Sequence, residues 1–493
     1  MEVAIVGAGF AGLGMAIALR RAGRDDFVLL ERAASVGGTW RENTYPGVAC
    51  DVPAHLYGFA EYPRPDAPGV YARGEEIRAY LEDVADRERL ETRLRLRTAV
   101  TAATWEAAAA AWRIETAGVR AEVIEAEVLV LACGRLTEPS IPAIAGLETF
   151  PGPMFHSARW DHDVSLTGAR VALVGTGASA VQILPELART AAHVTLFQRT
   201  PAWIVPRRDA SYTDAERRRL RHDPDALADL RRTLYLQGEE RFASRSGDAT
   251  ASEAARAEAL AHLHTQVADP ALRRALTPDY AFGCTRVLLS DDFYPAVAGD
   301  RVTLEPTALA HVDGARLVSA AGREHDADVV VLATGFASAE QPYAALVGGE
   351  DDVTLAEHWG SGMTSFASTV VAGFPNLFVL NGPNASLGHN SAVLMIQEQA
   401  AYAVDALAHR DATPDGVLRV RPDAEAEYTA EIDAAAASTP WITGGCRNWY
   451  VDPRSGRLTL LWPGTVDAFR ARLARADGSE FAPAPARAGK GAP

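Results

Sequence analysis

Two glycine-rich loops, each between a strand-like and a helix-like segment, constrain the fold of this chain most strongly. The first, Gly7-Ala8-Gly9-Phe10-Ala11-Gly12, follows an apolar run at residues 3–6 and precedes a helical pattern at 13–22. Glycines at this spacing permit a tight turn and a close approach of the backbone to a pyrophosphate. The next strand, at 27–31, ends in Glu31, whose carboxylate can accept hydrogen bonds from ribose hydroxyls. We therefore predict a dinucleotide site at Gly7, Gly9, Gly12 and Glu31, rather than a purely structural turn.

The second loop, Gly175-Thr176-Gly177-Ala178-Ser179-Ala180, repeats this pattern with alanine in the third glycine position. Its following strand, at 194–199, ends in Gln198-Arg199-Thr200 instead of an acid. Because an arginine there can pair with a 2'-phosphate, the loop is expected to prefer NADPH over NADH. The alternative for Arg199 is an exposed charge at a strand end without a specific partner. The residues that we assign to this site are Gly175, Gly177, Ser179, Arg199 and Thr200.

Charge and composition exclude other classes of protein. The formal net charge of −16 opposes binding to nucleic acid or anionic membranes, and no apolar run approaches the roughly 20 residues of a membrane helix. The N-terminus lacks a signal-peptide pattern, so we expect a water-soluble, cytoplasmic protein. The cysteines form no close pair and no metal-ligand spacing, so we expect free thiols, no metal site and no dithiol-disulfide reductase. These four cysteines are Cys50, Cys133, Cys284 and Cys446.

A third motif lies directly ahead of the second glycine loop, in the order F-x-G-x-x-x-H-x-x-x-W-D. Its fixed positions are Phe150, Gly152, His156, Trp160 and Asp161. It resembles the signature of type I Baeyer-Villiger monooxygenases, a family of class B flavoprotein monooxygenases. The resemblance covers nearly the whole chain and includes Gly37-Gly38-Thr39-Trp40, Tyr45-Pro46-Gly47, Cys50-Asp51, Gln198-Arg199-Thr200-Pro201, Ala333-Thr334-Gly335-Phe336 and Gly388-His389-Asn390-Ser391. We interpret His156 as a satisfied interdomain histidine that couples domain motion, rather than as a catalyst.

The resemblance implies that FAD binds at the first loop, with Gly38, Thr39 and Trp40, and that NADPH binds at the second. It further implies that Asp51 and Arg286 are an active-site acid and arginine beside the flavin. Reduced flavin and oxygen give a C4a-peroxide anion there, and a fixed cation in a water-poor site stabilises such a charge. The alternative is an ordinary Asp-Arg surface pair, which contributes little.

Two further positions qualify the resemblance. The residue before Arg286 is commonly a lysine in the family, but here it is Thr285, so the preference for NADPH is expected to be weaker. Asn448-Trp449-Tyr450 resembles the family's mobile loop, whose tryptophan covers the nicotinamide and excludes water. A packed core tryptophan explains Trp449 equally well.

The predicted architecture is an α/β fold with two doubly wound, Rossmann-like dinucleotide-binding domains, the second inserted into the first. Ala, Arg, Leu and Glu at helical spacing predict a helical insertion in the second domain. The C-terminal residues alternate Ala, Pro and Gly without apolar periodicity, which predicts disorder. The expected ranges are the FAD-binding domain at 1–140 and 336–477, the NADPH-binding domain at 141–335, its helical insertion at about 206–283, and the disordered tail at 478–493.

The predicted function is insertion of one oxygen atom of O2 beside a ketone carbonyl to give an ester or lactone. Oxygenation at nitrogen or sulfur is the alternative reaction, and a non-catalytic flavin-binding sensor or scaffold is the alternative of another class. No motif specifies the ketone or the oligomeric state. The alanine- and arginine-rich composition is typical of high-GC bacteria, from which we expect a role in natural-product tailoring.

Overall fold

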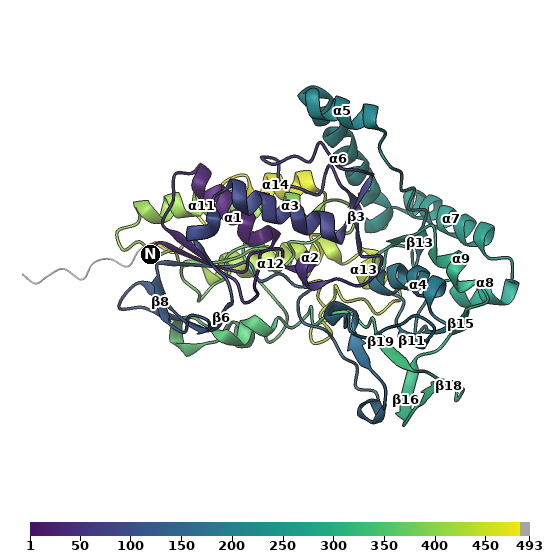
Figure 1. Cartoon of the computed structure of the whole chain (residues 1–493). Helices are drawn as coiled ribbons and strands as arrows, with labels where there is room; N and C mark the ends of the chain where they lie inside the picture. Colours follow the sequence, from purple (N-terminus) through teal and green to yellow (C-terminus); the bar gives the residue numbers. More distant parts are fainter. Residues whose placement is uncertain (484–493) are drawn as a thin grey trace, which may run out of the picture.

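The computed structural model describes residues 1–483. Two parallel five-stranded sheets organise these residues, and Figure 1 shows how the elements are arranged around them. The first sheet has the order β21-β9-β1-β2-β5, and all of its neighbouring strands pair in parallel. Its three central strands are apolar runs buried on both faces, as parallel strands require. The strand bounds are β1 (Val3–Val6), β2 (Phe27–Leu30), β5 (Leu94–Arg95), β9 (Val128–Leu131) and β21 (Leu377–Val379).

Helices cover one face of this first sheet, and a smaller sheet covers the other. On the helical face, α1 (Phe10–Arg21) packs against α3 (Gly74–Arg87) and α11 (Ala392–Ala412), and α11 packs against α14 (Val466–Leu473). The smaller sheet has the order β20-β6-β7-β8 and places Trp105 and Trp112 against the first sheet. Its strands are β6 (Thr98–Glu106), β7 (Ala111–Gly118), β8 (Val123–Ala126) and β20 (Val347–Gly348).

The second parallel sheet has the order β10-β19-β11-β12-β15. One face packs on α4 (Ala178–Thr190) and α9 (Phe293–Val297), and the other packs on a three-stranded antiparallel sheet. Its strands are β10 (Met154–His156), β11 (Arg170–Val174), β12 (His193–Phe197), β15 (Val302–Glu305) and β19 (Val329–Leu332). The antiparallel strands are β16 (Leu309–Asp313), β17 (Arg316–Ser319) and β18 (Glu324–Asp326).

The stretch between residues 214 and 276 is helical, as its composition predicted. α6 packs against both α5 and α7, and in Figure 1 α5 and α6 rise above the two sheets. Asp223 and Asp269 cap two of these helices directly before prolines at the first helical position. The helices are α5 (Asp214–His222), α6 (Pro224–Ser246), α7 (Ala249–Gln266) and α8 (Pro270–Leu276).

Short elements complete the described part of the chain. The short strands are β3 (Ala49–Pro53), β4 (Tyr71–Arg73), β13 (Ile204–Val205) and β14 (Leu288–Leu289). The remaining α-helices are α2 (Thr39–Glu42), α10 (Leu355–His358), α12 (Pro422–Ala436) and α13 (Pro440–Thr443). Single 3-10 turns occur at η1 (Leu90–Thr92), η2 (Leu147–Thr149), η3 (Ser157–Arg159), η4 (Pro342–Leu346) and η5 (Glu350–Asp352). None of the helices within residues 1–483 has the length and apolar character needed to cross a bilayer.

The predicted α/β architecture is confirmed, with one parallel sheet inserted between parts of the other. The second sheet consists of β10, β11, β12, β15 and β19, and the chain then returns to add β21 to the first sheet. The exact domain boundaries stay predictions.

The predicted disorder of the C-terminal tail is wrong for residues 478–483. Glu480 is buried and accepts a hydrogen bond from the Tyr402 hydroxyl at 2.8 Å, and the buried Phe481 stacks on the His409 ring. These side chains find partners on α11, which the local composition of the tail could not indicate. The rest of the predicted tail, 484–493, lies outside the described residues.

Candidate active site

An ion pair between Asp51 and Arg286 joins segments that are 235 residues apart. Asp51 lies in β3, where the pairing with β4 is irregular, and Arg286 lies just before β14. The Arg286 Nε and Nη2 atoms donate to Asp51 Oδ2 at 2.8 and 2.5 Å. An irregularity in a β-ladder commonly re-aims a side chain, and here it accompanies an acid that meets a distant arginine.

The pair is partly buried, and its charges reinforce one another. Burial alone would raise the pKa of Asp51, but the charge and hydrogen bonds of Arg286, together with Arg207, hold it below its ordinary value. The Asp51 carboxylate in turn raises the pKa of Arg286. Both groups are therefore charged at neutral pH, and the pair presents a fixed guanidinium.

A cavity of about 1150 Å³ connects this ion pair with both glycine loops. It opens between the carboxyl ends of the two parallel sheets, where open α/β sheets bind their ligands. Gly12 and the third motif do not line it. The predicted residues that do are Gly7, Gly9, Glu31, Gly38, Thr39, Trp40, Asp51, Gly175, Gly177, Ser179, Arg199, Thr200, Arg286 and Trp449.

The first glycine loop is shaped by close backbone contacts. Gly7 has a φ of +106°, and a Cβ there would lie 2.5 Å from the Ala132 carbonyl oxygen. A Cβ on Gly12 would overlap the Gly7 carbonyl oxygen, so Gly12 acts on the shape of the loop from outside the cavity. The buried Glu31 carboxylate accepts hydrogen bonds from the Ala8 and Ala33 backbone N–H groups, each at 2.9 Å.

The second glycine loop leaves its predicted phosphate-binding residues accessible. Arg199 and Thr200 are exposed at the edge of the cavity, and Thr176 Oγ1 donates to the Thr200 carbonyl oxygen at 2.7 Å. Within residues 1–483, the Arg199 side chain has neither a hydrogen bond nor an ion pair with the protein. Its guanidinium is therefore available to an anion from the cavity.

The third motif runs through β10, the edge strand of the second sheet, and none of its fixed residues lines the cavity. His156 is buried, its Nδ1 accepts a hydrogen bond from the Ala158 N–H at 3.1 Å, and its ring meets Phe336 edge to face. Burial lowers the pKa of His156, so the ring is neutral at neutral pH. Phe336 lines the cavity, whereas His156 does not.

The other motif residues serve packing or turns. Phe150 is buried, and Gly152 lies against the Asp328 carbonyl oxygen. Trp160 packs on Phe155, and the Asp161 carboxylate accepts a hydrogen bond from the Asp163 N–H.

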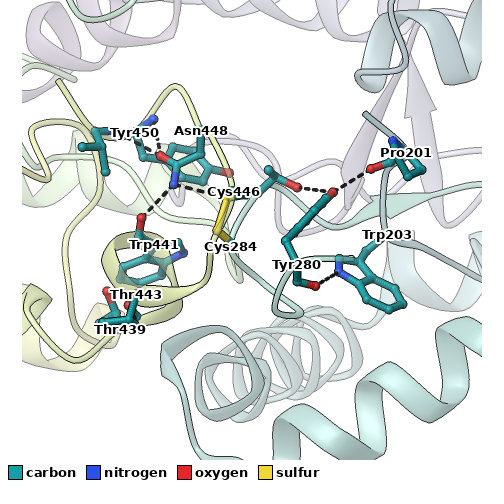
Figure 2. The surroundings of a disulfide bond; sticks show 12 residues. Pro201, Trp203, Tyr280, Cys284, Thr439, Trp441, Thr443, Cys446, Asn448 and Tyr450 are labelled. Atoms are coloured by element: carbon teal, nitrogen blue, oxygen red, sulfur yellow. Dashed lines mark hydrogen bonds between the residues drawn. A yellow bond between two sulfur atoms is a disulfide. The ribbon is translucent and has the colours of Figure 1, made fainter. Parts of the chain in front are cut away.

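The expectation that all four cysteines are free is wrong. Cys284 and Cys446 form a disulfide, with Cα atoms 6.2 Å apart, whereas Cys50 and Cys133 are free. Figure 2 shows that the bond joins the turn before Arg286 to the loop that carries Asn448 and Tyr450. The two cysteines are 162 residues apart, so no local spacing could indicate their pairing.

The two loops that the disulfide joins are also held by hydrogen bonds (Figure 2). The Tyr280 hydroxyl donates to the Pro201 carbonyl oxygen at 2.8 Å and lies 3.1 Å from Thr285 Oγ1. On the other loop, Asn448 Nδ2 donates to the Trp441 carbonyl oxygen at 2.8 Å. Trp449 is partly buried on Tyr450 and lines the cavity, so it is neither a fully buried core residue nor an exposed one.

Comparison with known proteins identifies the family. The model of the Flavin-binding monooxygenase-like family matches residues 1–214. A Baeyer-Villiger monooxygenase of Streptomyces coelicolor is 46% identical over 99% of this chain and 94% of its own length. The chain belongs to the Baeyer-Villiger monooxygenase family.

Solved structures agree with this membership of the Baeyer-Villiger monooxygenases. An oxidised steroid monooxygenase bound to NADP is 30% identical, with a TM-score of 0.85 over 98% of this chain and 99% of that one. A complex of OTEMO with FAD and NADP is 25% identical, with a TM-score of 0.86 over the same shares of the two chains. The resemblance predicted from the sequence motifs is confirmed.

The disulfide of this Baeyer-Villiger family member lies outside the lining of the cavity. Cys284 is fully buried, and neither Cys284 nor Cys446 lines the cavity.

Sequence reasoning missed a group of arginines around Arg286. Arg135 lines the cavity and donates to Asn381 Oδ1, and burial, followed by the charge of Arg286, lowers its pKa to about 10. Arg245, on α6, is buried close enough to Arg286 to feel its charge. Arg135 follows Gly134 in a turn after β9, and Arg245 lies in a helix, but neither position indicated an active-site role. Only the tertiary structure reveals that both arginines lie near Arg286.

Proposed function

We propose that the chain binds FAD and NADPH and inserts one oxygen atom of O2 between a ketone carbonyl carbon and its neighbouring carbon. The reaction consumes the ketone, O2, NADPH and a proton, and it yields an ester or lactone, NADP+ and water. The observation that carries the proposal is the Asp51–Arg286 pair at a cavity lined by both glycine loops.

The residues around the first loop fit FAD. The backbone contacts at Gly7 and Gly12 exclude side chains, so the N-terminus of α1 can approach a pyrophosphate closely. Glu31 lies beside this loop and can bind a ribose, while Gly38, Thr39 and Trp40 line the adjoining wall. When bound and reduced by NADPH, FAD supplies the activation of O2.

The second loop fits NADPH in the same way. Gly175, Gly177 and Ser179 line the cavity at the start of α4, and the exposed Arg199 has no protein partner within the described residues. A guanidinium can form two hydrogen bonds to a phosphate, which favours a cofactor that carries a 2'-phosphate. Because NADPH is maintained in the cytoplasm, we retain that compartment as part of the proposal.

Arg286 is the catalytic cation of the proposal, and Asp51 is the group that orients it. Negative charge develops on oxygen during the reaction, and a preorganised guanidinium stabilises that charge without moving. Asp51 accepts two N–H groups through one oxygen, which fixes the plane of the guanidinium. His156 is proposed to couple the two sheets through Phe336, and Trp449 to exclude water from the cavity.

A substrate panel tests the reaction class. Purified protein is supplied with FAD, NADPH and isotopically labelled O2, together with cyclic ketones, open-chain ketones and sulfides. We expect ketones to give esters or lactones that contain one labelled oxygen atom, accompanied by NADPH consumption. Sulfoxides as the only labelled products would instead assign heteroatom oxygenation, and the absence of any labelled product would overturn the proposal.

A further inference from the structure

Arg245, in the last turn of α6, is a buried cation whose side chain has no hydrogen-bonding partner among residues 1–483. Arg245 is 9% exposed, and its Nε and Nη1 atoms form no hydrogen bond within the described part of the chain. The guanidinium lies over the Phe282 ring, 4.9 Å from the centroid. A cation–π contact attracts the charge but satisfies no N–H group, so the donors of Arg245 remain unmatched.

The surroundings of Arg245 add positive charge instead of neutralising it. Arg241 lies one helical turn before Arg245 on α6. Arg286, from the segment that precedes β14, lies close enough for its charge to act on Arg245. Burial, then Arg241 and Arg286, lowers the pKa of Arg245 to about 10, so it is still charged at neutral pH. A protein rarely retains a buried, unpaired charge unless a ligand or partner neutralises it.

The nearby carboxylates are already engaged. Asp51 accepts both of its guanidinium hydrogen bonds from Arg286. Glu258, whose charge reaches Arg245, forms an ion pair with Arg208. No carboxylate within residues 1–483 lies within ion-pair distance of Arg245, so the missing anion must come from outside these residues.

The three arginines meet at a side pocket of about 30 Å³. Its lining includes Arg241, Arg245 and Arg286. The remaining wall combines apolar side chains, such as Val52, Leu56 and Leu234, with the polar Asp51, His389 and Asn390. Asp51, Val52, Arg286 and Asn390 line both this pocket and the large cavity. A molecule held beside Arg286 can therefore extend a substituent towards Arg245.

We propose that this arginine pocket is an anion subsite and that the substrate is a ketone bearing a carboxylate a few bonds from its carbonyl group. The inference rests on the proposed ketone oxygenation and adds the substrate class. The carboxylate accepts hydrogen bonds from Arg245, with Arg241 as the second cation, while the carbonyl group stays beside Arg286. A planar carboxylate matches the fork of a guanidinium, and the apolar wall contacts the carbon chain.

Matched substrate pairs test the subsite. The probes are cyclohexanone carboxylic acids in which the chain between ring and carboxylate grows by one methylene at a time, each with its methyl ester and with cyclohexanone itself. For at least one chain length, we expect the wild-type kcat/KM for the acid to exceed that for its ester by about 10- to 100-fold, the factor for one charge-assisted hydrogen bond.

Arg245→Met should remove most of this preference for the acid. Arg232→Met is the matched control, because Arg232 lies exposed on the same helix and its loss changes the net charge equally. The control should retain the wild-type ratio of acid to ester. Arg241→Met gives a second variant at a more exposed position, and it should reduce the ratio by a smaller factor.

Binding without turnover gives an independent measurement. The acid should raise the thermal midpoint of the wild-type holoenzyme and fail to raise that of Arg245→Met. The variant alone should be no less stable than wild type, because it removes an unpaired buried charge. A midpoint shift by the acid in both proteins would overturn the subsite.

The outcomes separate failure of the subsite from failure of the proposed reaction. If wild type oxygenates cyclohexanone, the acids and the esters at equal kcat/KM, the anion subsite is wrong and the reaction stands. If no ketone is oxygenated at all, the proposed reaction fails first. If Arg245→Met raises the KM for NADPH and leaves the acid-to-ester ratio unchanged, Arg245 binds the cofactor and the subsite is overturned.

Discussion

Arg286 combines a permanent charge with a fixed orientation, which few single residues provide. Two of its N–H groups meet Asp51, while its Nη1 forms no hydrogen bond with the protein in the part of the chain that the structure describes. The guanidinium can therefore donate towards a ligand without breaking its pair with Asp51. A lysine at this position would present a point charge and could not maintain both contacts.

Replacing Arg286 tests its catalytic role. Arg286→Ala should lower the rate of ester formation by ~10²-fold or more, the usual scale for one preorganised electrostatic donor. Arg286→Lys should restore little of this loss. Ester formation is measured with ketone, NADPH and O2, and the flavin content of each variant serves as the folding control. Ester formation at the wild-type rate by Arg286→Ala would place the active site elsewhere.

The role that we propose for Arg199 is to bind the 2'-phosphate that distinguishes NADPH from NADH. If it binds the 2'-phosphate, Arg199→Ala should raise the KM for NADPH by about tenfold and change that for NADH much less. Arg189→Ala is a matched control. Arg189 is an exposed arginine near the C-terminal end of α4, and it does not line the cavity. Equal effects of Arg199→Ala on the two cofactors would leave only a structural role.

At the scale of elements, loops and the short strand β3 form the proposed site, while the parallel sheets hold them in place. The turn at residues 282–286 and the loop at 444–449 come from distant parts of the chain, and the Cys284–Cys446 disulfide joins them. Three hydrogen-bonding contacts of Tyr280 also hold the first turn. Its hydroxyl contacts the Pro201 carbonyl oxygen and Thr285 Oγ1, and its carbonyl oxygen accepts from Trp203 Nε1. The disulfide is thus one of several restraints that position Arg286 and Trp449.

Removing the disulfide should lower stability and loosen this corner of the cavity. The double variant Cys284→Ser/Cys446→Ser is expected to be less stable by about 2–4 kcal/mol, the typical contribution of a disulfide. Dithiothreitol should lower the wild-type thermal midpoint to that of the double variant and leave the double variant unchanged. More NADPH should also be consumed per ester formed, because the Trp449 loop is less restrained. Alkylation of unfolded protein that finds four thiols without reductant would show that the bond is absent.

At the scale of the whole molecule, the proposed reaction site depends on the cavity that both parallel sheets line. Asp51 belongs to the first dinucleotide unit and Arg286 to the segment that follows the helical insertion. His55 lies close to this junction, where its ring packs on Tyr212 and its carbonyl oxygen accepts a hydrogen bond from Arg231 on α6. His55 is fully buried, and neither of its ring nitrogens has a hydrogen-bond partner among the residues that the structure describes.

The burial of His55 predicts a loss of stability in mild acid. Burial, with the charges of Arg64 and Arg231, lowers its pKa from 6.5 to about 4. As the pH falls through 6.5, the unfolded chain binds a proton at His55 that the folded chain excludes until about 4. Folding stability therefore decreases across this window, by about 3 kcal/mol in full.

The contribution of His55 can be separated from that of other groups. His55→Leu should show a shallower fall of the urea midpoint between neutral pH and pH 4 than wild type. His222→Gln, at an exposed histidine of α5, should keep the wild-type slope. Parallel slopes in all three proteins would mean that His55 does not cause acid sensitivity.

Both nucleotide loops were predictable because their signals are local. Gly7 needs a positive φ and space beside the backbone, and Glu31 needs only to end the next strand. Such requirements involve residues a short distance apart in the chain, so the sequence by itself determined two dinucleotide units and their order. The family motifs added Asp51 and Arg286, whose contact in the structure agrees with that resemblance.

Only the tertiary structure decided the features that depend on distant contacts. Cys284 meets Cys446 and Phe481 packs on α11 because the fold brings separate segments together. The donors of Arg245 are unmatched because the fold brings no carboxylate of the described residues within hydrogen-bonding distance of them. The composition and spacing of a sequence segment report which residues are neighbours along the chain. Burial, pairing and uncompensated charge depend instead on which residues are neighbours in space.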